Sequence, residues 1–247
     1  PCCAFALSAA LARPETNRNS YPVSGLLPAG AAAEESLQTK WALGFRNFKW
    51  KVGVEPVGTE QAIFAKLCQG LPEGVRLRLD ANGCWDLKTL QNWARFLQDH
   101  RTELDYLEQP LAVGQEAVMR SVAEETQLPI ALDESLQGPS GRQWLQPGAW
   151  CGPLVIKPAL MGDVASLRTL LRPIATQVVL SSVFETTVGV ANALSLAELV
   201  AGNLRPLGFD TAGAFDDDLS LPIEAASLSL SRDKLDLLWE TLSPHSN

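Results

Sequence analysis

Ionisable side chains recur along the chain at nearly regular intervals of about 24 to 29 residues. The members of this series are Lys51, Asp80, Glu108, Asp133 and Lys157, and the hydroxyl of Ser181 continues it. A strand, a short loop, a helix and a return loop together occupy roughly 25 residues. We therefore expect each strand–helix unit to deliver one polar group from the end of its strand. In a barrel, those strand ends meet around one mouth.

Three consecutive units end in a carboxylate, within the segments LRLDANG, LDYLEQPL and PIALDESL. Asp80, Glu108 and Asp133 would repel one another strongly if they met unpaired in a partly dry mouth. A divalent cation removes this repulsion. Oxygen ligands without His or Cys select a hard ion, Mg²⁺ first and Mn²⁺ as a substitute. The alternative is that the carboxylates form structural ion pairs with Arg76, Arg78 or the lysines.

Two lysines, Lys49 and Lys51, share one face of a strand in the segment NFKWKVG, whose other face is apolar. Two ammonium groups on one face lower each other's pKa, which makes one of them a usable base. Lys157 is expected roughly across the barrel from them. A cation between opposed lysines suits removal of a proton α to a carboxylate, with the cation stabilising the enediolate. The alternative for the KxK pair is a solvated strand edge.

Apolar patterning predicts alternating strands and helices around these residues. The expected strands are Pro22–Pro28, Asn47–Val52, Val75–Asp80, Leu104–Gln109, Ile130–Glu134, Leu154–Lys157, Val178–Ser182 and Pro206–Phe209. The expected helices are Ala4–Ala12, Thr59–Gln69, Leu87–His100, Gln115–Glu125, a turn at Arg142–Leu145, Val164–Ala175 and Thr187–Val200, with Asp86 and Asp163 as N-caps. This alternation implies an α/β fold of parallel β/α units, a (β/α)8-type TIM barrel, with an open doubly wound sheet as the alternative.

The pattern divides the chain into three segments. Residues 1–20 are expected to hold the last helix before the barrel, and residues 21–216 the barrel itself. Residues 217–247 would form an extension that packs on the barrel or on a preceding domain. The extension contains an expected helix, Asp233–Leu242, with Leu235, Leu238 and Leu242 facing inward. Because the chain starts at Pro1 within a helical pattern, we expect a fragment without its N-terminal part.

Composition excludes several classes of function. The net charge is −8 and no run of Lys or Arg forms a stripe, which argues against nucleic acid or an anionic membrane as a partner. Only two histidines are present, so a His-rich zinc site or a Ser-His-Asp triad has little support. The five cysteines lack CxxC spacing and are expected to be buried thiols in a reducing cytoplasm. No apolar stretch reaches the roughly 18 residues of a membrane span.

The ordered motifs resemble the muconate-lactonising branch of the enolase superfamily. They are KxK at Lys49–Lys51, DAN at Asp80–Asn82, EQP at Glu108–Pro110, DES at Asp133–Ser135 and IKP at Ile156–Pro158. Within this branch, LSSVFET at Leu180–Thr186 and LGFDT at Leu207–Thr211 most resemble the o-succinylbenzoate synthases. These are hydro-lyases of menaquinone and phylloquinone biosynthesis that act on a small carboxylate.

The resemblance implies a Mg²⁺-dependent syn-dehydration of 2-succinyl-6-hydroxy-2,4-cyclohexadiene-1-carboxylate to o-succinylbenzoate. Asp80, Glu108 and Asp133 would bind the Mg²⁺. Lys51 would remove the α-proton and return it to the departing hydroxyl, while Lys49 tunes Lys51. Lys157 would stabilise the intermediate from the opposite face.

The resemblance also implies supporting roles. Asn82 and Glu134 would orient the ligands, and Ser181 with the Gly208 backbone would hold the succinyl tail. The family's α+β capping domain, which precedes the barrel, is expected to be absent from this chain, so activity of these residues alone is in doubt. Two alternatives stay open: an N-acylamino acid racemase or dipeptide epimerase, and a catalytically silent metal-binding barrel. No pattern indicates an oligomeric state.

Overall fold

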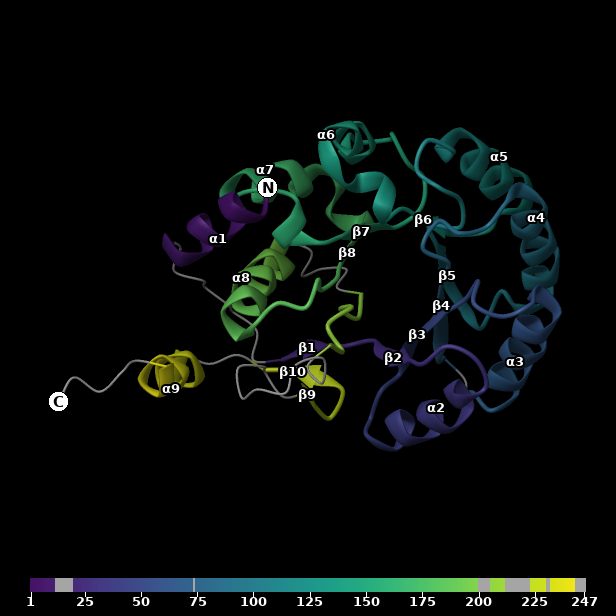
Figure 1. Ribbon diagram of the computed structural model, residues 1–247, viewed down its shortest axis with the longest axis horizontal. Helices are drawn as coiled ribbons and strands as arrows, with labels where there is room; N and C mark the ends of the chain where they lie inside the picture. The colour runs from purple at the N-terminus through teal and green to yellow at the C-terminus, as the bar shows by residue number, and fades with distance from the viewer. Residues whose placement is uncertain (12–19, 73, 200–204, 212–222, 230–231, 243–247) are drawn as a thin grey trace.

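The structure is a computed structural model of the 247-residue chain. It describes residues 1–11, 20–72, 74–199, 205–211, 223–229 and 232–242 (Figure 1). Within them the chain is an α/β protein in which strands and helices alternate and neighbouring strands run parallel. The predicted parallel β/α units are therefore confirmed.

Two parallel sheets carry the candidate residues. The first has the order β2 (Gly25–Leu27), β3 (Asn47–Lys51), β4 (Arg76–Asp80), β5 (Leu104–Glu108) and β6 (Ile130–Ala131). The second pairs β7 (Leu154–Ile156) with β8 (Val178–Leu180). Isolated parallel bridges continue the pairing beyond these sheets, and they join Leu132 to Leu154, Ser181 to Gly208, and Val23 to Leu207.

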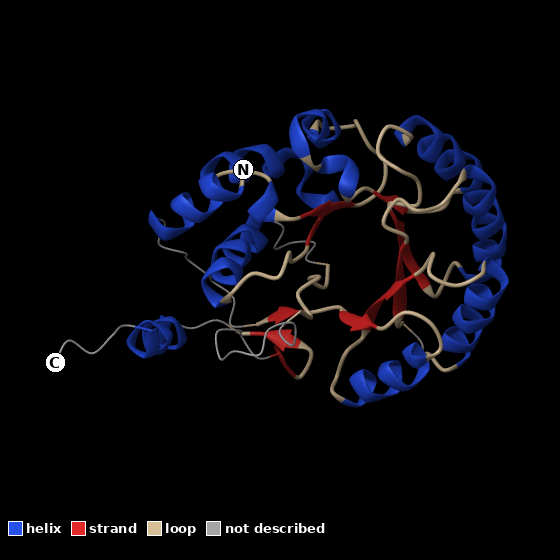
Figure 2. Ribbon diagram, viewed as in Figure 1, coloured by secondary structure: helices blue, strands red, loops and turns tan. Residues whose placement is uncertain are grey.

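Helices lie outside the strands, which surround a common centre (Figure 2). They are α2 (Ala32–Ala42), α3 (Val57–Gln69), α4 (Leu87–Phe96), α5 (Glu116–Thr126), α6 (Gly138–Gly141), α7 (Val164–Leu171) and α8 (Thr187–Ala197). Both predicted N-caps are confirmed: Asp86 accepts a hydrogen bond of 2.7 Å from the Thr89 amide, and Asp163 one of 2.9 Å from Ser166. Short 3₁₀ segments follow α4 and α7 at Leu97–His100 and Arg172–Gln177.

Side chains on the inner face of the strands form a cluster of their own. Tyr106, Ala131, Val155 and Val179, from β5, β6, β7 and β8, pack together apart from the larger core under the helices. Successive side chains of a strand point to opposite faces, so a residue two positions along shares the inner face. Glu108, Asp133, Lys157 and Ser181 each stand two positions beyond a member of this inner cluster. The alternation therefore directs all four towards the same interior.

Several predicted boundaries need correction. The expected strand Pro22–Pro28 is two strands, β1 (Tyr21–Pro22) and β2, and β1 pairs antiparallel with β10 (Ser227–Leu228), next to β9 (Ile223–Glu224). The expected strand Pro206–Phe209 appears only as isolated bridges. Strand β6 ends at Ala131, before a 3₁₀ turn at Glu134–Leu136. Helix α2 was not predicted, because only Ala33 and Leu37 of it are buried and its apolar pattern is weak.

The two terminal helices are α1 (Cys2–Leu11) and α9 (Arg232–Leu242). Leu235 packs against the core as predicted, and Leu238 is half-buried. The side chain of Leu242 and residues 217–222, the start of the expected extension, lie outside the described residues. In the described part of the chain, no helix is long and apolar enough to cross a membrane.

The prediction of buried thiols is wrong. Cys68 is half-buried, and burial together with nearby Glu103 raises the pKa of its thiol to about 12. The other cysteines, Cys2, Cys3, Cys84 and Cys151, are exposed. Cys68 lies in α3 and packs against the core, whereas the others stand in α1 or in loops.

Candidate active site

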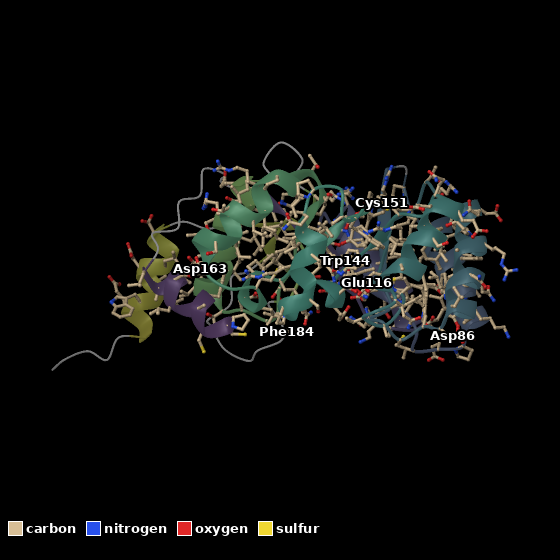
Figure 3. The ribbon with its side chains drawn as sticks, turned by 90° about the horizontal axis from the view of Figure 1, so that it is seen from above. Asp86, Glu116, Trp144, Cys151, Asp163 and Phe184 are labelled. Carbon is tan, nitrogen blue, oxygen red and sulfur yellow. The ribbon has the colours of Figure 1, made fainter. Side chains whose placement is uncertain are left out.

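A cavity of about 310 Å³ opens where the strands end. Seven of the predicted site residues line it, namely Lys49, Lys51, Asp80, Asn82, Lys157, Ser181 and Gly208. Figure 3 shows that Asp86 and Phe184, which follow β4 and β8, lie at one edge of the molecule, whereas Cys151, which precedes β7, lies at the opposite edge. The cavity is therefore on the carboxyl-end face of the strands, where parallel α/β folds place their chemistry.

Strand register brings the carboxylates together. Asp80 on β4 is paired with Lys51 on β3 and with Glu108 on β5, at the last position of all three strands. Glu108 is fully buried, and Asp133 follows the neighbouring strand β6 with 1% of its surface exposed. The three carboxylates thus stand on consecutive strand ends, with Asp80 at the cavity wall and the other two behind it.

Lysine ammonium groups neutralise all three carboxylates. Lys49 Nζ lies 2.7 Å from Asp80 Oδ2 and 2.6 Å from Glu108 Oε1. Lys157 Nζ lies 2.5 Å from Asp133 Oδ2. The ion pairs considered as an alternative are thus present with lysines. Arg78 instead pairs with Asp105 on β5, 2.8 Å away.

Lys51 differs from the other two lysines. Its side chain is exposed at the cavity, and no described carboxylate lies within ion-pair distance of its ammonium group. The predicted mutual lowering of lysine pKa values is wrong for Lys49. Burial alone would lower the pKa of Lys49, but the negative charges of Glu108 and Asp80 outweigh burial and raise it above its ordinary value.

Burial is the main influence on Glu108. It raises the pKa of this carboxyl well above its ordinary value; Lys49 opposes the shift, while the charges of Asp80 and Asp133 add to it. An anion held in such a place calls for a compensating positive charge. Lys49 supplies one in this arrangement, and a bound cation would supply another.

The donor set fits a hard cation. Among the described residues, Glu108 Oε2 and Asp133 Oδ1 are buried oxygens without a hydrogen-bond partner. They belong to neighbouring strand ends, and oxygen donors are what Mg²⁺ prefers. No group of three or more ligand-type side chains is gathered as a metal cluster in the described part of the chain. Lys49 pairs with both Asp80 and Glu108, and Lys157 pairs with Asp133, so a cation bound to all three carboxylates would have to displace both ammonium groups.

Asn82 and Glu134 contact each other as well as their neighbours. The backbone N–H of Asn82 donates to Asp80 Oδ1 at 3.1 Å, and its side-chain Nδ2 donates to Glu134 Oε1 at 3.2 Å. Asn82 has a φ of +45°, in the left-handed region that Asn tolerates better than most residues. Burial and the neighbouring Asp133 raise the pKa of Glu134. These contacts tie the loop after β4 to the loop after β6.

Some cavity residues were not predicted as functional. Asp210 accepts a hydrogen bond of 2.7 Å from the Leu26 amide and forms an ion pair with Lys40. It stands in the LGFDT segment, where an acidic residue after a short apolar run was an available signal. Ser182 and Thr211 also line the cavity and hydrogen-bond each other at 3.1 Å. Gln109, Ser135 and Glu116 form a buried network behind Asp133.

The match to a protein family covers most of the chain. The model described as "Enolase C-terminal domain-like" matches residues 32–217. The chain belongs to this enolase C-terminal domain-like family. This agrees with the resemblance that the ordered motifs indicated.

Members of the enolase family with known names share both sequence and fold with the chain. An o-succinylbenzoate synthase of Thermosynechococcus vestitus is 45% identical over 154 residues, which are 62% of this chain and 48% of that protein. A crystal structure of o-succinylbenzoate synthase from Thermosynechococcus elongatus BP-1, with Mg in its active site, superposes with a TM-score of 0.78 at 33% identity. It covers 98% of this chain and 74% of that one. The chain thus spans about half the length of the curated relative.

A second solved structure shares the fold alone. The L-Ala-D/L-Glu epimerase of Bacillus subtilis gives a TM-score of 0.78 at 20% identity, covering 93% of this chain and 68% of that one. Enzymes with different names therefore share this enolase-family fold.

Gly208 has no room for a side chain in this family member. A methyl group at its Cα would lie 2.6 Å from Ser181 Oγ and 3.2 Å from Ser181 Cβ. We expect Gly208→Ala to lower the free energy of unfolding by about 1–3 kcal/mol through overpacking. Adding Ser181→Ala should restore most of this, because the Oγ atom is the nearest obstacle. Urea unfolding of the single and double variants measures both effects; equal instability of the two would show that the clash is elsewhere.

Proposed function

We propose that the chain is the barrel part of an o-succinylbenzoate synthase. The observation that carries the proposal is the gathering of three carboxylates and three lysines from neighbouring strands at one cavity, where Asp80 and the lysines form the wall and Glu108 and Asp133 lie behind it. The 45% and 33% identities to o-succinylbenzoate synthases support the choice of reaction. The reaction would be dehydration of 2-succinyl-6-hydroxy-2,4-cyclohexadiene-1-carboxylate to o-succinylbenzoate.

The fold proposed for this function is a closed, modified (β/α)8 barrel. In support, parallel bridges lead from β6 to β7, from β8 to Gly208, and from Leu207 back to Val23 beside β2. Backbone hydrogen bonds of 2.8 Å from Ser24 to Leu207 and from Leu207 to Pro22 strengthen the last of these links. In a closed barrel, Lys51 and Lys157 would face each other across the mouth.

Asp80, Glu108 and Asp133 would hold a Mg²⁺ ion, with Mn²⁺ as a substitute. When bound, the ion would stabilise the negative charge that develops on the substrate carboxylate as the α-proton leaves. Asn82 and Glu134 would keep the ligand loops in place through their mutual hydrogen bond. Ser181 and the Gly208 backbone, which line the same cavity, would hold the succinyl tail.

Lys51 is the proposed base. It would remove the α-proton, since its terminal nitrogen lies at the cavity and no described carboxylate holds it in an ion pair. The resulting ammonium would then give this proton to the departing hydroxyl on the same face, which makes the elimination syn. Lys157 would remain an ammonium group and stabilise the developing charge. Lys49 would act on Lys51 through its charge from the same strand face.

A second candidate is epimerisation of N-acylamino acids or dipeptides. Lys51 and Lys157 line the same cavity, and two opposed lysines can move a proton from one face of a carbon to the other. The shared fold of the Bacillus epimerase is compatible with this reaction. A catalytically silent barrel is the remaining possibility, in which the lysine–carboxylate pairs are structural.

The setting proposed for the enzyme is the cytoplasm, in menaquinone or phylloquinone biosynthesis. Its partner would be a small carboxylate substrate, with neither nucleic acid nor membrane bound. The acidic net charge of −8 supports the exclusion of nucleic acid.

The proposed function is tested by supplying both classes of substrate to the protein at its full length with Mg²⁺. Formation of o-succinylbenzoate, measured by its absorbance, is the expected result. Racemisation of N-acylamino acids or epimerisation of dipeptides, without any dehydration, would favour the second candidate. Absence of both reactions from a folded protein would favour the silent barrel.

A further inference from the structure

A buried carboxamide connects two of the strand ends that carry carboxylates. Gln109 directly follows Glu108, has none of its surface exposed, and adopts a φ of +36°. A non-glycine residue in this left-handed region stores strain of about 1–3 kcal/mol, so the surroundings must hold it there. Such positions cluster at functional sites.

Every hydrogen-bonding position of the Gln109 side chain is used. Its Oε1 accepts from the backbone N–H groups of Asp133 at 3.0 Å and Ser135 at 3.1 Å. Its Nε2 donates to the Leu111 carbonyl at 2.9 Å and to Ser135 Oγ at 2.8 Å. A flipped amide would place its NH₂ group against two N–H donors, so only this orientation is satisfied.

The Gln109 carboxamide supplies a hydrogen-bond partner for the backbone at the point where strand pairing ends. Leu132 still exchanges backbone hydrogen bonds with the β7 region, to the Pro153 carbonyl and from the Val155 amide. At Asp133 the backbone leaves the strand conformation, with φ −128° and ψ −78°. The Asp133 amide then bonds to the side chain of Gln109.

Ser135 and Glu116 fix the orientation of the Gln109 carboxamide. Ser135 Oγ donates its hydrogen to Glu116 Oε1 at 2.6 Å, so it can only accept from Gln109. The same Glu116 oxygen accepts from the Gly114 amide at 3.0 Å. Glu116 is in the first turn of α5 and is buried. The chain of bonds therefore runs from a helix to the backbone of Asp133.

We propose that Gln109 is a positioning residue that sets Asp133 opposite Glu108, and that Ser135 and Glu116 fix its orientation. The proposal rests on the proposed function, because Asp133 and Glu108 act there as cation ligands. Loss of a residue that orients metal ligands costs about 10–100-fold in affinity. We expect Gln109→Met, which keeps the side-chain length and removes all four hydrogen bonds, to raise the Kd for Mg²⁺ by that factor.

A matched pair of variants tests the outer end of the network if Gln109→Met disturbs folding. Glu116→Gln keeps an oxygen that accepts from Ser135 and Gly114, so its Mg²⁺ Kd should stay within about twofold of the parent. Glu116→Ala removes that acceptor and should weaken Mg²⁺ binding several-fold. Gln98→Met is the control. Gln98 also donates hydrogen bonds to two backbone carbonyls, those of Ala94 and Thr126, but it lies on the helix side away from the cavity.

Two measurements on the chain decide the outcome: calorimetric titration with Mg²⁺ alone, and hydrogen exchange of the Asp133 and Ser135 amides without metal. The proposal predicts faster exchange of both amides and weaker Mg²⁺ binding in Gln109→Met and Glu116→Ala. Faster exchange with unchanged Mg²⁺ affinity would mean that the network is structural only. Unchanged exchange would refute the network itself. A parent chain that binds no Mg²⁺ would overturn the proposed metal site and, with it, the positioning role.

Discussion

Replacing Lys51 by alanine is expected to lower kcat for o-succinylbenzoate formation by about 10²–10⁴-fold, the usual contribution of a positioned acid–base group. Lys51 is the cavity lysine without a described ion-pair partner, so its terminal nitrogen can approach a substrate without leaving a carboxylate unpaired. The affinity for Mg²⁺ should remain within about twofold, because no described carboxylate depends on Lys51 for neutralisation. Steady-state kinetics and calorimetry measure the two quantities separately.

The control for Lys51→Ala is Lys66→Ala. Lys66 is an exposed lysine of α3 that pairs only loosely with Glu34, 3.6 Å away, so its loss should leave kcat unchanged. If Lys51→Ala kept near-normal turnover, Lys51 would not be the base. Lys157, which lines the same cavity, would then be the next candidate.

The replacement Asp80→Asn is expected to raise the Kd for Mg²⁺ at least about 10-fold. Loss of a residue that only orients a metal ligand already weakens metal binding by about that factor. The variant keeps the shape of the side chain but removes the charge that a hard cation needs. Asp80 is also the carboxylate at the cavity wall, between Lys51 and Glu108 in the strand register. Calorimetric titration of the folded variant with Mg²⁺ gives the result.

Asp86→Asn is the matched control, six residues further along the chain. Asp86 is exposed and caps α4, and Asn is an equally good N-cap, so both fold and Mg²⁺ affinity should be unchanged. Unchanged affinity in Asp80→Asn would instead support the interpretation of Asp80 and Lys49 as a structural ion pair.

The order and direction of the candidate residues could be predicted from sequence because strand geometry repeats. The spacing of Asp80, Glu108 and Asp133 placed them on consecutive strand ends, and the alternation of β4 and β5 placed the first two on the inner face. These predictions need only the length of a β/α unit and the period of a strand. The caps at Asp86 and Asp163 rest on equally local chemistry.

The partners of those residues could not be predicted, because they depend on the third dimension. Lys49 was expected to influence Lys51, yet its ammonium group lies between Asp80 and Glu108, which reverses the direction of its pKa shift. Gln109 was not predicted as a functional residue, although it lies in the EQP motif. Its role depends on a left-handed φ and on a serine two positions after Asp133, neither of which has a periodic signal.

The most direct test of a cation site between the three carboxylates is an anomalous difference map from crystals of the protein at its full length, grown with Mn²⁺. Manganese scatters anomalously and accepts the oxygen ligands that Mg²⁺ prefers. We predict one strong peak within coordination distance of Asp80, Glu108 and Asp133, with the ammonium groups of Lys49 and Lys157 turned away from them. Crystals with no peak at these residues, and with both lysines still paired as described, would contradict the account.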